Sequence, residues 1–410
     1  MLLNTDDFRR EARKRLPRFV FDYVDGAADD NSCLRRNHGD LDALTLTPRV
    51  LRDTSRIDTS IEVFGSRWAL PFGVAPTGLN GLVRAGGDAM LARAAARNGV
   101  PFVLSTASNM RLEDIRATAT DAVQWMQLYV MHREMAARIV QRARQAGYQA
   151  LVLTVDVPVS GNRELDARNG FRVPLRPTAR LGWDLVTHPR WSVSTLLNGT
   201  PDFANLTDPG QGTDSASMQA ALLARAMDRT LVWETLGWLR DHWKGPLLLK
   251  GVLHADDART AVNYGVDGVI VSNHGGRQLD AAPSAISALP AVVAAVQGRI
   301  PVFMDSGIRR ATHIAKAVAL GAKAVFLGRP LLYGLAARGE AGVDAVFSMF
   351  RADLERTMAL LGAPQIGQIS LSQRQEGTVL GNTAPPSRRR TLQTGLSPVQ
   401  DSAPACGPAQ

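Results

Sequence analysis

Residues 246–273 are PLLLKGVLHADDARTAVNYGVDGVIVSN, and this stretch decides the fold. Two short apolar runs, PLLLK (246–250) and GVIVSN (268–273), flank a segment with helical spacing that ends in Gly265. Helices commonly end in a glycine, and strands that are apolar throughout are typical of parallel sheets covered by helices. The stretch therefore predicts a strand, a helix and a second strand parallel to the first.

The same alternation extends over most of the chain. Six further apolar runs are predicted to be strands, namely LPFGVAPT (70–77), PFVLST (101–106), VQWMQLYV (123–130), ALVLTVD (150–156), PVFMDS (301–306) and AVFLGR (324–329). Eight alternating strand–helix units predict an α/β fold whose strands close into a (β/α)8 TIM barrel. A doubly wound sheet is the main alternative, but the G-x-G-x-x-G motif of its nucleotide site does not follow the first strand.

One barrel would use almost the whole chain, so we predict a single domain over residues 1–371. Residues 1–69 precede the first strand and are predicted to form an N-terminal helical cap. Residues 372–410 are rich in Pro, Ser, Gln and Gly, a composition that cannot pack a core, so we expect a disordered tail there. Cys33 and Cys406 cannot form a disulfide framework and match no metal-ligand spacing, so no metal site is expected.

An insert at residues 160–245 separates the fourth and fifth strands by far more than the few residues of an ordinary connection. Its arginine, aromatic and leucine residues include Arg163, Arg168, Arg172, Arg176, Arg180, Arg190, Phe171, Leu181, Trp183 and Trp191. Two interpretations are open. The insert could be a lid over the active face, or it could dock on an anionic membrane through arginine attraction and the insertion of Trp, Leu and Val side chains.

The charge balance leaves the class of partner open. The formal net charge is +9, which would suit nucleic acid, an anionic membrane or anionic small molecules. No apolar run approaches the roughly 20 residues needed to span a bilayer. The N-terminus, MLLNTDDFRREARKRLPRF, lacks the apolar core and the cleavage site of a signal peptide, so we expect a cytoplasmic location.

Polar side chains stand at the carboxyl end of every predicted strand. They are Thr77, Ser105, Gln127 with Tyr129, Thr154 with Asp156, Lys250, Ser272 with His274, Asp305, and Gly328 with Arg329. A single one of these could be an ordinary capping or loop residue. In a barrel, however, the carboxyl ends of all strands meet on one face, and active sites are built there. Eight coincidences therefore predict a site on this face.

The segment VIVSNHGGRQLD (269–280) carries the strongest chemical signal. His274 leaves a buried strand and is suited to act as a general base, with Asp156 placed to orient its ring and to support the imidazolium. After two glycines, Arg277 can return to the same pocket and bind a carboxylate bidentately, with Arg163 as a second anchor. The alternative is that His274 only caps the following segment and that Arg277 is solvated.

Three further features point to ligands. Lys250 could form a Schiff base, or it could stabilise negative charge on a reduced flavin, and spacing does not separate the two. Tyr23 and Tyr129 could donate hydroxyl hydrogen bonds to a substrate. The loops after strands seven and eight, Ser306-Gly307 with Arg309 and Gly328-Arg329, have the glycines and positive charge typical of a phosphate site.

These motifs resemble those of the FMN-dependent α-hydroxy-acid dehydrogenase and oxidase family, from about residue 8 to about residue 385. The motifs that carry the resemblance are SNHGGRQLD, PTGLNG (76–81), LSTASN (104–109), QLYV (127–130), LTVD (153–156), LLKG (248–251), DSGIRR (305–310) and LGRPLLYGLAARGE (327–340). Within the family the chain is most similar to members that oxidise (S)-mandelate, through PTGLNG, LSTASN, HPRW (188–191), MQAALLARAMD (218–228) and EG…NTAP (376–385).

The resemblance implies FMN as the cofactor and a role for each matched residue. His274 would be the base, supported by Asp156. Substrate would contact Tyr23, Tyr129, Arg163 and Arg277. Around the flavin the implied residues are Pro76, Thr77 and Gly78 near N5, Ser105, Gln127 and Thr154 at the ring, Lys250 at the N1 side, and Ser272. Asp305 would bind the ribityl hydroxyls, and Gly307, Arg309, Gly328 and Arg329 would hold the phosphate.

The expected reaction is the oxidation of an (S)-2-hydroxy acid, mandelate-like or lactate, to a 2-oxo acid, with electrons passed to a membrane quinone. Gly78 and Ala107 replace an Ala and a Trp of glycolate oxidases, which implies poor use of oxygen and room for a bulky side chain. The expected enzyme is peripheral on the inner face of the cell membrane, tetrameric by analogy, and does not bind nucleic acid. The alternatives are an oxygen-dependent oxidase that produces hydrogen peroxide, and a flavin-dependent isomerase of isoprenoid diphosphates.

Overall fold

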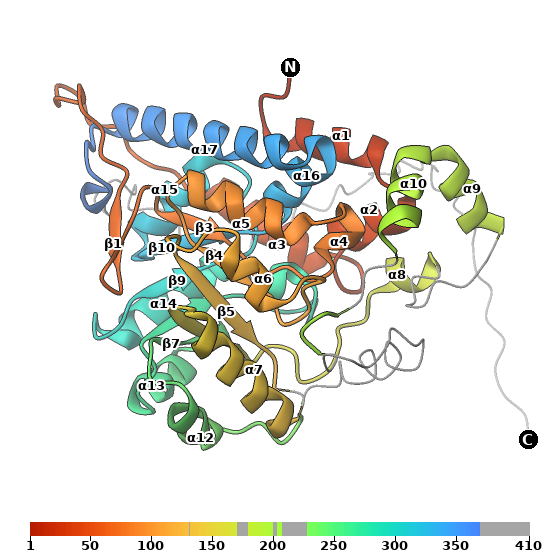
Figure 1. Ribbon diagram of the computed structural model, residues 1–410. Coiled ribbons are helices and arrows are strands. Elements are labelled where there is room, and N and C mark those ends of the chain that lie inside the picture. Colours follow the sequence, from red (N-terminus) through yellow and green to blue (C-terminus); the bar gives the residue numbers. More distant parts are fainter. Residues whose placement is uncertain (131, 170–178, 200–202, 207–227, 370–410) are drawn as a thin grey trace, which may run out of the picture. The chain divides into compact units, whose positions relative to one another are not determined.

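Eight parallel strands close into a barrel in the computed structural model, so the predicted (β/α)8 fold is confirmed (Figure 1). Around the barrel the strands follow the order β10-β3-β4-β5-β6-β7-β8-β9. Their bounds are β3 (Phe72–Val74), β4 (Phe102–Leu104), β5 (Gln124–Leu128), β6 (Ala150–Thr154), β7 (Leu247–Val252), β8 (Gly268–Val271), β9 (Val302–Met304) and β10 (Ala324–Leu327). Each lies within or largely within a predicted apolar run.

The structure describes residues 1–130, 132–169, 179–199, 203–206 and 228–369. All of them belong to one compact unit, Met1–Gln375. The predicted tail at 372–410 lies outside the described residues, and the predicted domain boundary at residue 371 stays a prediction.

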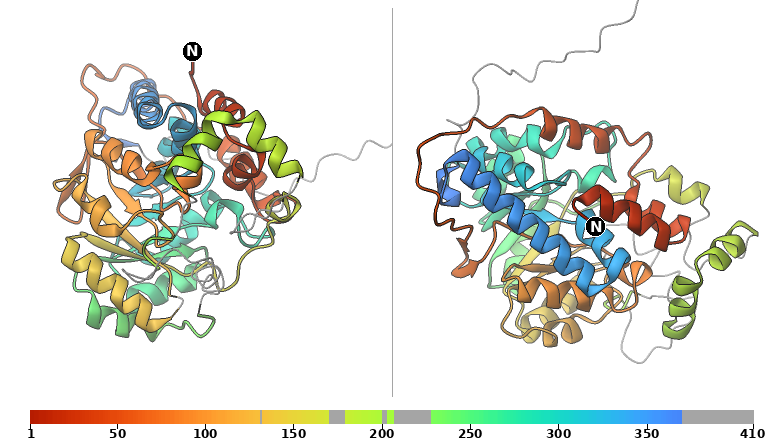
Figure 2. Two further views of the ribbon diagram at one scale, coloured as in Figure 1. Left: turned by 45° about the vertical axis from the view of Figure 1, so that its right-hand side comes forward. Right: turned by 90° about the horizontal axis from the view of Figure 1, so that it is seen from above.

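Helices surround the barrel (Figures 1 and 2). Those that connect or follow the strands are α4 (Asn80–Val83), α5 (Gly87–Arg97), α6 (Leu112–Ala117), α7 (Arg133–Ala146), α13 (Ala255–Asn263), α14 (Ala285–Val296), α15 (Ala311–Ala319), α16 (Arg329–Arg338) and α17 (Glu340–Leu361), with short 3-10 turns η1 (His274–Gly276) and η2 (Ile366–Gln368). Helix α7 shows how such helices end. Gly147 has a φ of 84°, and its N–H donates to the carbonyls of Ala143 and Arg144.

The first 69 residues contribute to both ends of the barrel. They form α1 (Thr5–Arg15), α2 (Arg18–Asp25), α3 (Ser32–Ala43) and the antiparallel hairpin of β1 (Ile61–Val63) and β2 (Ser66–Trp68). Helix α2 reaches the active face, where Tyr23 and Val24 line a pocket. The hairpin was not predicted and lies at the amino-terminal end of the strands.

Trp68 of this hairpin closes the barrel from below. It is fully buried, and its ring lies 5.4 Å from that of Trp125 and 6.2 Å from those of Phe303 and Phe326. These three rings belong to β5, β9 and β10, so the hairpin packs against strands far apart in the sequence. Phe326 also lines the pocket on the opposite side, so Trp68 supports the pocket floor.

The insert after β6 contains the helices α8 (Glu164–Arg168), α9 (Ala179–Thr187), α10 (Pro189–Asn198) and α12 (Thr235–His242). Phe171, Arg172 and Arg176 of the predicted basic surface lie outside the described residues. Among the residues that are described, no helix combines the length and hydropathy needed to cross a membrane. Helices α9 and α10 project beside α2 at the edge of the barrel in both figures.

Replacing Trp68 by Ala should lower the free energy of unfolding by about 3–5 kcal/mol, because it leaves a cavity among three packed rings. Urea unfolding followed by circular dichroism measures the change. The neighbouring Arg67, whose side chain is 72% exposed, offers a matched control, and its replacement by Ala should change stability by about 0.5 kcal/mol or less. Equal losses for the two variants would show that the hairpin does not support the barrel.

Candidate active site

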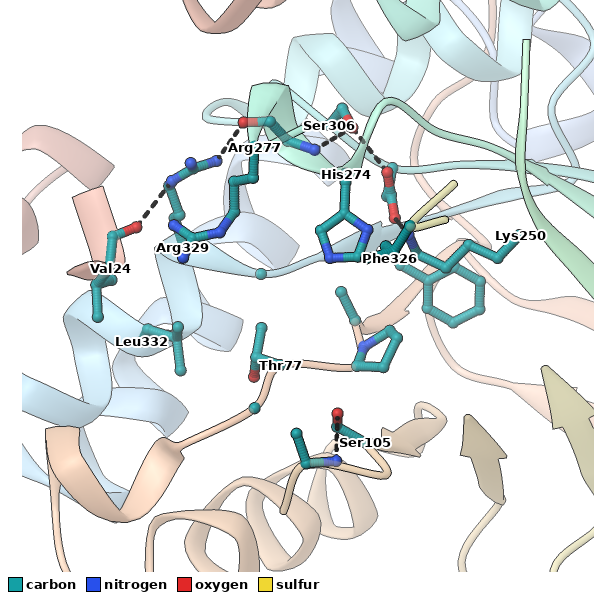
Figure 3. A pocket seen from close by; sticks show the side chains of 18 of the residues that line it. Val24, Thr77, Ser105, Lys250, His274, Arg277, Ser306, Phe326, Arg329 and Leu332 are labelled. Carbon is teal, nitrogen blue, oxygen red and sulfur yellow. Dashed lines mark hydrogen bonds and ion pairs between the residues drawn. The ribbon is translucent and has the colours of Figure 1, made fainter. Parts of the chain in front are cut away.

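One pocket lies at the carboxyl ends of the barrel strands (Figure 3). Most of the predicted site residues line it, namely Tyr23, Pro76, Thr77, Gly78, Ser105, Tyr129, Arg163, Lys250, His274, Arg277, Asp305, Gly307, Arg309, Gly328 and Arg329. The others, Gln127, Thr154, Asp156 and Ser272, lie behind this lining and are linked to it by hydrogen bonds, directly or through one another. The structure thus brings all of the predicted site residues together.

The backbone of the HGG turn explains why two glycines follow His274. His274, Gly275 and Gly276 all have a positive φ, at 58°, 68° and 77°. A Cβ on Gly275 would lie 2.6 Å from Nη1 of Arg329, and one on Gly276 would lie 2.8 Å from the backbone nitrogen of Leu34. Only glycine fits both positions, and His274 itself adopts a conformation that non-glycine residues rarely take.

His274 is held between an acid and a phenol. Its Nδ1 lies 2.9 Å from Oδ1 of Asp156, and its Nε2 lies 3.4 Å from the hydroxyl of Tyr129. Burial lowers the pKa of His274, the carboxylate of Asp156 works to raise it, and the charge of Lys250 works to lower it. The neutral ring, with its proton on Nδ1, therefore presents Nε2 to the pocket as a base.

Lys250 is a buried cation between two carboxylates. Its Nζ lies 3.7 Å from Oδ2 of Asp156 and 3.4 Å from Oδ2 of Asp305, and it donates to Oγ of Ser272 at 3.0 Å. Burial works to lower the pKa of Lys250, but the two carboxylates outweigh it and raise the pKa above its usual value. A Schiff-base lysine needs a free amine, so this environment favours the interpretation of Lys250 as a fixed positive charge.

Arg277 and Arg163 place two guanidinium groups in the pocket, with Oδ2 of Asp166 3.9 Å from Nη1 of Arg163. Arg277 donates through Nη1 to the carbonyls of Tyr23 and Gly26, at 2.7 and 3.0 Å, and its guanidinium lies 4.9 Å from the Tyr23 ring. Burial, and then the nearby charge of Arg163, lower the pKa of Arg277 to about 9. Among the residues that the structure describes, the buried Nε of Arg163 has no hydrogen-bond partner. An anion bound between the two guanidinium groups would give Nε of Arg163 a hydrogen-bond partner and would offset the cost of burying the charge of Arg277.

A second cationic region lies by the loops after β9 and β10. Arg329 donates to the carbonyls of Val24, Gly275 and Gly26, at 2.9, 3.0 and 2.7 Å, and burial lowers its pKa to about 10. Figure 3 shows Arg329 and Arg277 on one side of the pocket, facing Thr77 and Ser105 on the other. Both arginines donate to the carbonyl of Gly26, so this side of the pocket is continuously cationic and suits anionic groups.

Gly307 makes room at the phosphate loop. Its φ is 85°, and a Cβ there would lie 2.8 Å from the carbonyl oxygen of Asn37. Ser306 accepts from the N–H of Gly275 at 3.0 Å and donates to Asp305 at 2.8 Å. The loop therefore holds a small side chain that is already paired and a glycine that packs against helix α3.

Polar side chains behind the opposite wall form a chain of hydrogen bonds. Ser105 donates to Oε1 of Gln127 at 3.2 Å, and Nε2 of Gln127 donates to Thr154 at 3.1 Å. The register of β6 and β7 sets Thr154 opposite Lys250. Three neighbouring strands thus present amide, hydroxyl and ammonium groups side by side, which suits the alternating donors and acceptors of a heteroaromatic ring.

The residues present fit FMN. The unpartnered Nε of Arg163 and the lowered pKa values of Arg277 and Arg329 indicate missing anions, and Gly307 keeps the backbone close to the pocket. Lys250 supplies a positive charge deep in the same pocket. A phosphorylated, electron-accepting ring and a carboxylate substrate together match this arrangement.

Sequence reasoning missed an apolar wall of the pocket. Val157, Phe203 and Leu206 line it together with the predicted Ala107. Phe203 and Leu206 come from the insert, whose pattern indicated only a basic and aromatic surface. Their distance in sequence from the barrel motifs left no signal that they reach the pocket. This wall suits an uncharged, bulky ligand group.

A buried carboxylate that holds two pocket loops together was also missed. Asp88 accepts from Nδ2 of Asn80 at 2.7 Å and from Oγ of Ser108 at 2.8 Å, and Oδ1 of Asn80 accepts from the hydroxyl of Thr77 at 3.0 Å. Burial raises the pKa of Asp88 despite these bonds. In the sequence Asp88 looks like an ordinary acidic residue in the first turn of a helix.

Comparison with known proteins gives a consistent set of relatives. The model of a family described as FMN-dependent dehydrogenase matches residues 12–375. The chain is 48% identical to (S)-mandelate dehydrogenase of Pseudomonas putida over 384 residues, which is 94% of this chain and 96% of that relative. It is 41% identical to L-lactate dehydrogenase of Alcaligenes faecalis over 372 residues, which is 90% of this chain and 98% of that relative.

A crystal structure agrees with these matches. The structure described as that of the monotopic membrane protein (S)-mandelate dehydrogenase superposes with a TM-score of 0.88 at 47% identity. The match covers 92% of this chain and 100% of that one. A structure of mandelate oxidase superposes with a TM-score of 0.75 at 36% identity, over 90% of this chain and 97% of the other.

Replacing Asp88 by Ala should lower the free energy of unfolding by about 1–3 kcal/mol, because the N–H of Asn109 loses its acceptor, while Nδ2 of Asn80 and Oγ of Ser108 keep only the carbonyls of Thr77 and Met110. Replacing it by Asn, which keeps one acceptor oxygen, should cost less. Asp257, exposed in the first turn of α13, controls for the effect of a charge at a helix start. If removing Asp257 costs as much as removing Asp88, the loops do not depend on the buried carboxylate.

Proposed function

The chain belongs to the family of FMN-dependent dehydrogenases, as its motifs predicted, and we propose that it oxidises (S)-2-hydroxy acids with a bulky apolar side chain, of which mandelate is the model. The observation that carries this proposal is the position of His274 beside Arg163 and Arg277 and across from an apolar wall, all in one pocket. A base, a carboxylate anchor and an apolar surface are the groups that such a substrate needs.

The substrate carboxylate would bind between Arg163 and Arg277. Two guanidinium groups can bind a carboxylate through paired hydrogen bonds, and the anion offsets the cost of burying positive charge there. The side chain would then lie against Val157, Phe203 and Leu206. Lactate would fill less of this wall than mandelate, so we expect it to be oxidised with a higher KM.

His274 would take a proton from the substrate on Nε2, and Asp156 would stabilise the imidazolium across the 2.9 Å contact with Nδ1. When bound, FMN supplies an acceptor for the two electrons that leave the substrate carbon. Conversion of the alcohol to the ketone releases two protons and two electrons; His274 would hold one of the protons, and the other would pass to the flavin with the two electrons. Lys250 would keep positive charge beside the ring as the electrons arrive.

We further propose that a membrane quinone is the final electron acceptor. Supporting this is an apolar surface on α9 and α10, where Trp183, Val186, Val193, Leu196 and Leu197 are between 55% and 82% exposed. Contiguous exposed apolar side chains on a helix are typical of surfaces that enter the headgroup region of a bilayer. A relative with a similar fold is described as a monotopic membrane protein.

The aromatic residues of this surface differ in their surroundings. Trp183 is 70% exposed and suits insertion. Under the membrane-docking interpretation Trp191 would insert as well, but it is buried, its Nε1 donates to the carbonyl of Leu82 at 2.7 Å, and its ring packs edge-on against Phe19. Trp191 therefore anchors α10 to the body of the protein.

Replacing His274 by Gln should lower kcat by about 10²–10⁴-fold, because a positioned base contributes about that factor. Anaerobic addition of mandelate, lactate and glycolate in turn, with the bleaching of visible absorbance recorded, measures the transfer of electrons from substrate to flavin.

For the unchanged enzyme, kcat/KM should be level near neutral pH and fall at acid pH. The pKa of His274 is lowered from 6.5, so the base is neutral above that pH and is lost to protonation only as the pH falls through the lowered value.

The residual activity of the Gln variant should not show this fall of kcat/KM at acid pH. A variant that bleaches at the original rate with mandelate would exclude His274 as the base. Hydrogen peroxide formed in proportion to substrate in air would favour an oxygen-dependent oxidase over a quinone-linked dehydrogenase.

Replacing Leu196 and Leu197 together by Glu should release the activity from sedimented membranes, because two carboxylates would replace side chains that are 82% and 79% exposed. Replacing Leu360 by Glu is the matched control, since it is 66% exposed on α17, and the activity should stay with the membranes. An unchanged distribution of the double variant would contradict the docking surface.

A further inference from the structure

Side chains from elsewhere in the chain fix the backbone of Arg309 at both of its polar groups. Its N–H donates to Nδ1 of His313 at 3.2 Å, and its carbonyl oxygen accepts from the hydroxyl of Thr5 at 2.6 Å. Thr5 is 2% exposed and His313 is 4% exposed, so neither bond is open to competition from bulk water. The loop that carries Arg309 into the pocket is therefore pinned at that residue.

His313 occupies a position that usually belongs to another residue type. It is the third residue of α15, from which a Glu or Gln side chain commonly reaches back to a free backbone N–H before the helix. Here an imidazole makes that bond. Because Nδ1 accepts, the ring proton lies on Nε2, which is 3.0 Å from Oδ1 of Asp42. Asp42 on α3 thus selects the tautomer that the bond to Arg309 requires.

The charges around His313 keep its ring neutral. Burial lowers the pKa of His313, and Lys316 on its own helix and Arg309 in the loop lower it further, while Asp42 works in the opposite direction. A protonated ring would point an N–H at the N–H of Arg309, so the neutral form is the one compatible with the bond.

Helix α1 also reaches the side chain of Arg309, by a second route. Arg9 pairs with Asp25 through two hydrogen bonds of 2.6 Å, and Asp25 accepts from the hydroxyl of Tyr333 at 2.6 Å. The guanidinium of Arg309 lies 6.0 Å from the centre of the Tyr333 ring. The first turns of the chain thus contact both the backbone and the surroundings of this arginine.

We propose that Thr5 and His313 are positioning residues for the phosphate of FMN, and that they act by fixing the backbone from which Arg309 reaches it. The proposal rests on the phosphate-binding role proposed for Arg309. An arginine side chain has several rotatable bonds, so a fixed origin reduces the conformational freedom lost when its guanidinium binds an anion. Helix α1, which contributes no residue to the pocket itself, is then part of the cofactor site.

The test compares FMN with riboflavin, which lacks the phosphate, in the full-length protein stripped of flavin and titrated by fluorescence. Thr5→Val keeps the volume of the side chain, His313→Phe keeps a planar ring, and each removes the bond to Arg309. Each should raise the Kd for FMN about five- to tenfold, the effect of one lost buried hydrogen bond, and change the Kd for riboflavin less than about twofold. Thr5→Ser and His313→Gln, which restore a donor and an acceptor, should recover most of the FMN affinity.

Two further variants separate the possible outcomes. Lys316→Met removes another bond between α15 and α3, from Nζ to the carbonyl of Leu41. At about pH 8, where the His313 ring is neutral without the charge of Lys316, this variant should leave both Kd values unchanged. Arg309→Ala should weaken FMN binding selectively. If it does while Thr5→Val and His313→Phe leave FMN binding intact, or weaken FMN and riboflavin equally, the positioning role is wrong and the role of Arg309 stands. If Arg309→Ala has no selective effect, both the phosphate role and the inference fall.

Discussion

The buried ammonium of Lys250 is the group on which the active site depends. It lies within 3.7 Å of Asp156 and 3.4 Å of Asp305, and it donates to Ser272, so it joins residues that follow β6, β9 and β8. Two carboxylates this deeply buried would be costly without a cation between them. Asp156 in turn orients His274. The charge of Lys250 therefore helps to hold this base in place, although Lys250 and His274 belong to different strands. The barrel makes this possible because its parallel strands all end on one face.

Much of this arrangement could be predicted from local sequence. The barrel strands are apolar throughout and are bounded by polar or glycine residues, so their number and order are visible in the pattern. The HGG turn is visible too, since successive glycines indicate backbone that other residues cannot adopt. What escaped prediction depends on contacts between distant segments. The hairpin of β1 and β2 has strands of three residues, and only the packing of Trp68 beneath the barrel gives it a role.

The same limit applies to single residues. Asp88 has the sequence context of a helix start, and its burial between two loops follows only from how α5 packs. Trp191 belongs to a segment whose composition allowed either a lid or a membrane-docking surface, and its indole N–H is bonded to α4. Periodicity shows that a helix has two faces. It does not show which neighbour covers one of them.

The desolvated arginines of the pocket link cofactor binding to the stability of the fold. Arg277 and Arg329 are buried with backbone carbonyls as their hydrogen-bond partners, and burial lowers the pKa of both. Desolvated guanidinium groups without a counter-charge destabilise the folded chain, and a ligand that binds only the folded state stabilises it by mass action. The anionic groups of a cofactor and a substrate would therefore complete the electrostatics of the barrel as well as its chemistry. Tyr23 and Val24 of α2, with Phe203 and Leu206 of the insert, cover the carboxyl ends of the strands and exclude water there, and this exclusion strengthens the attraction of each arginine for an anionic ligand.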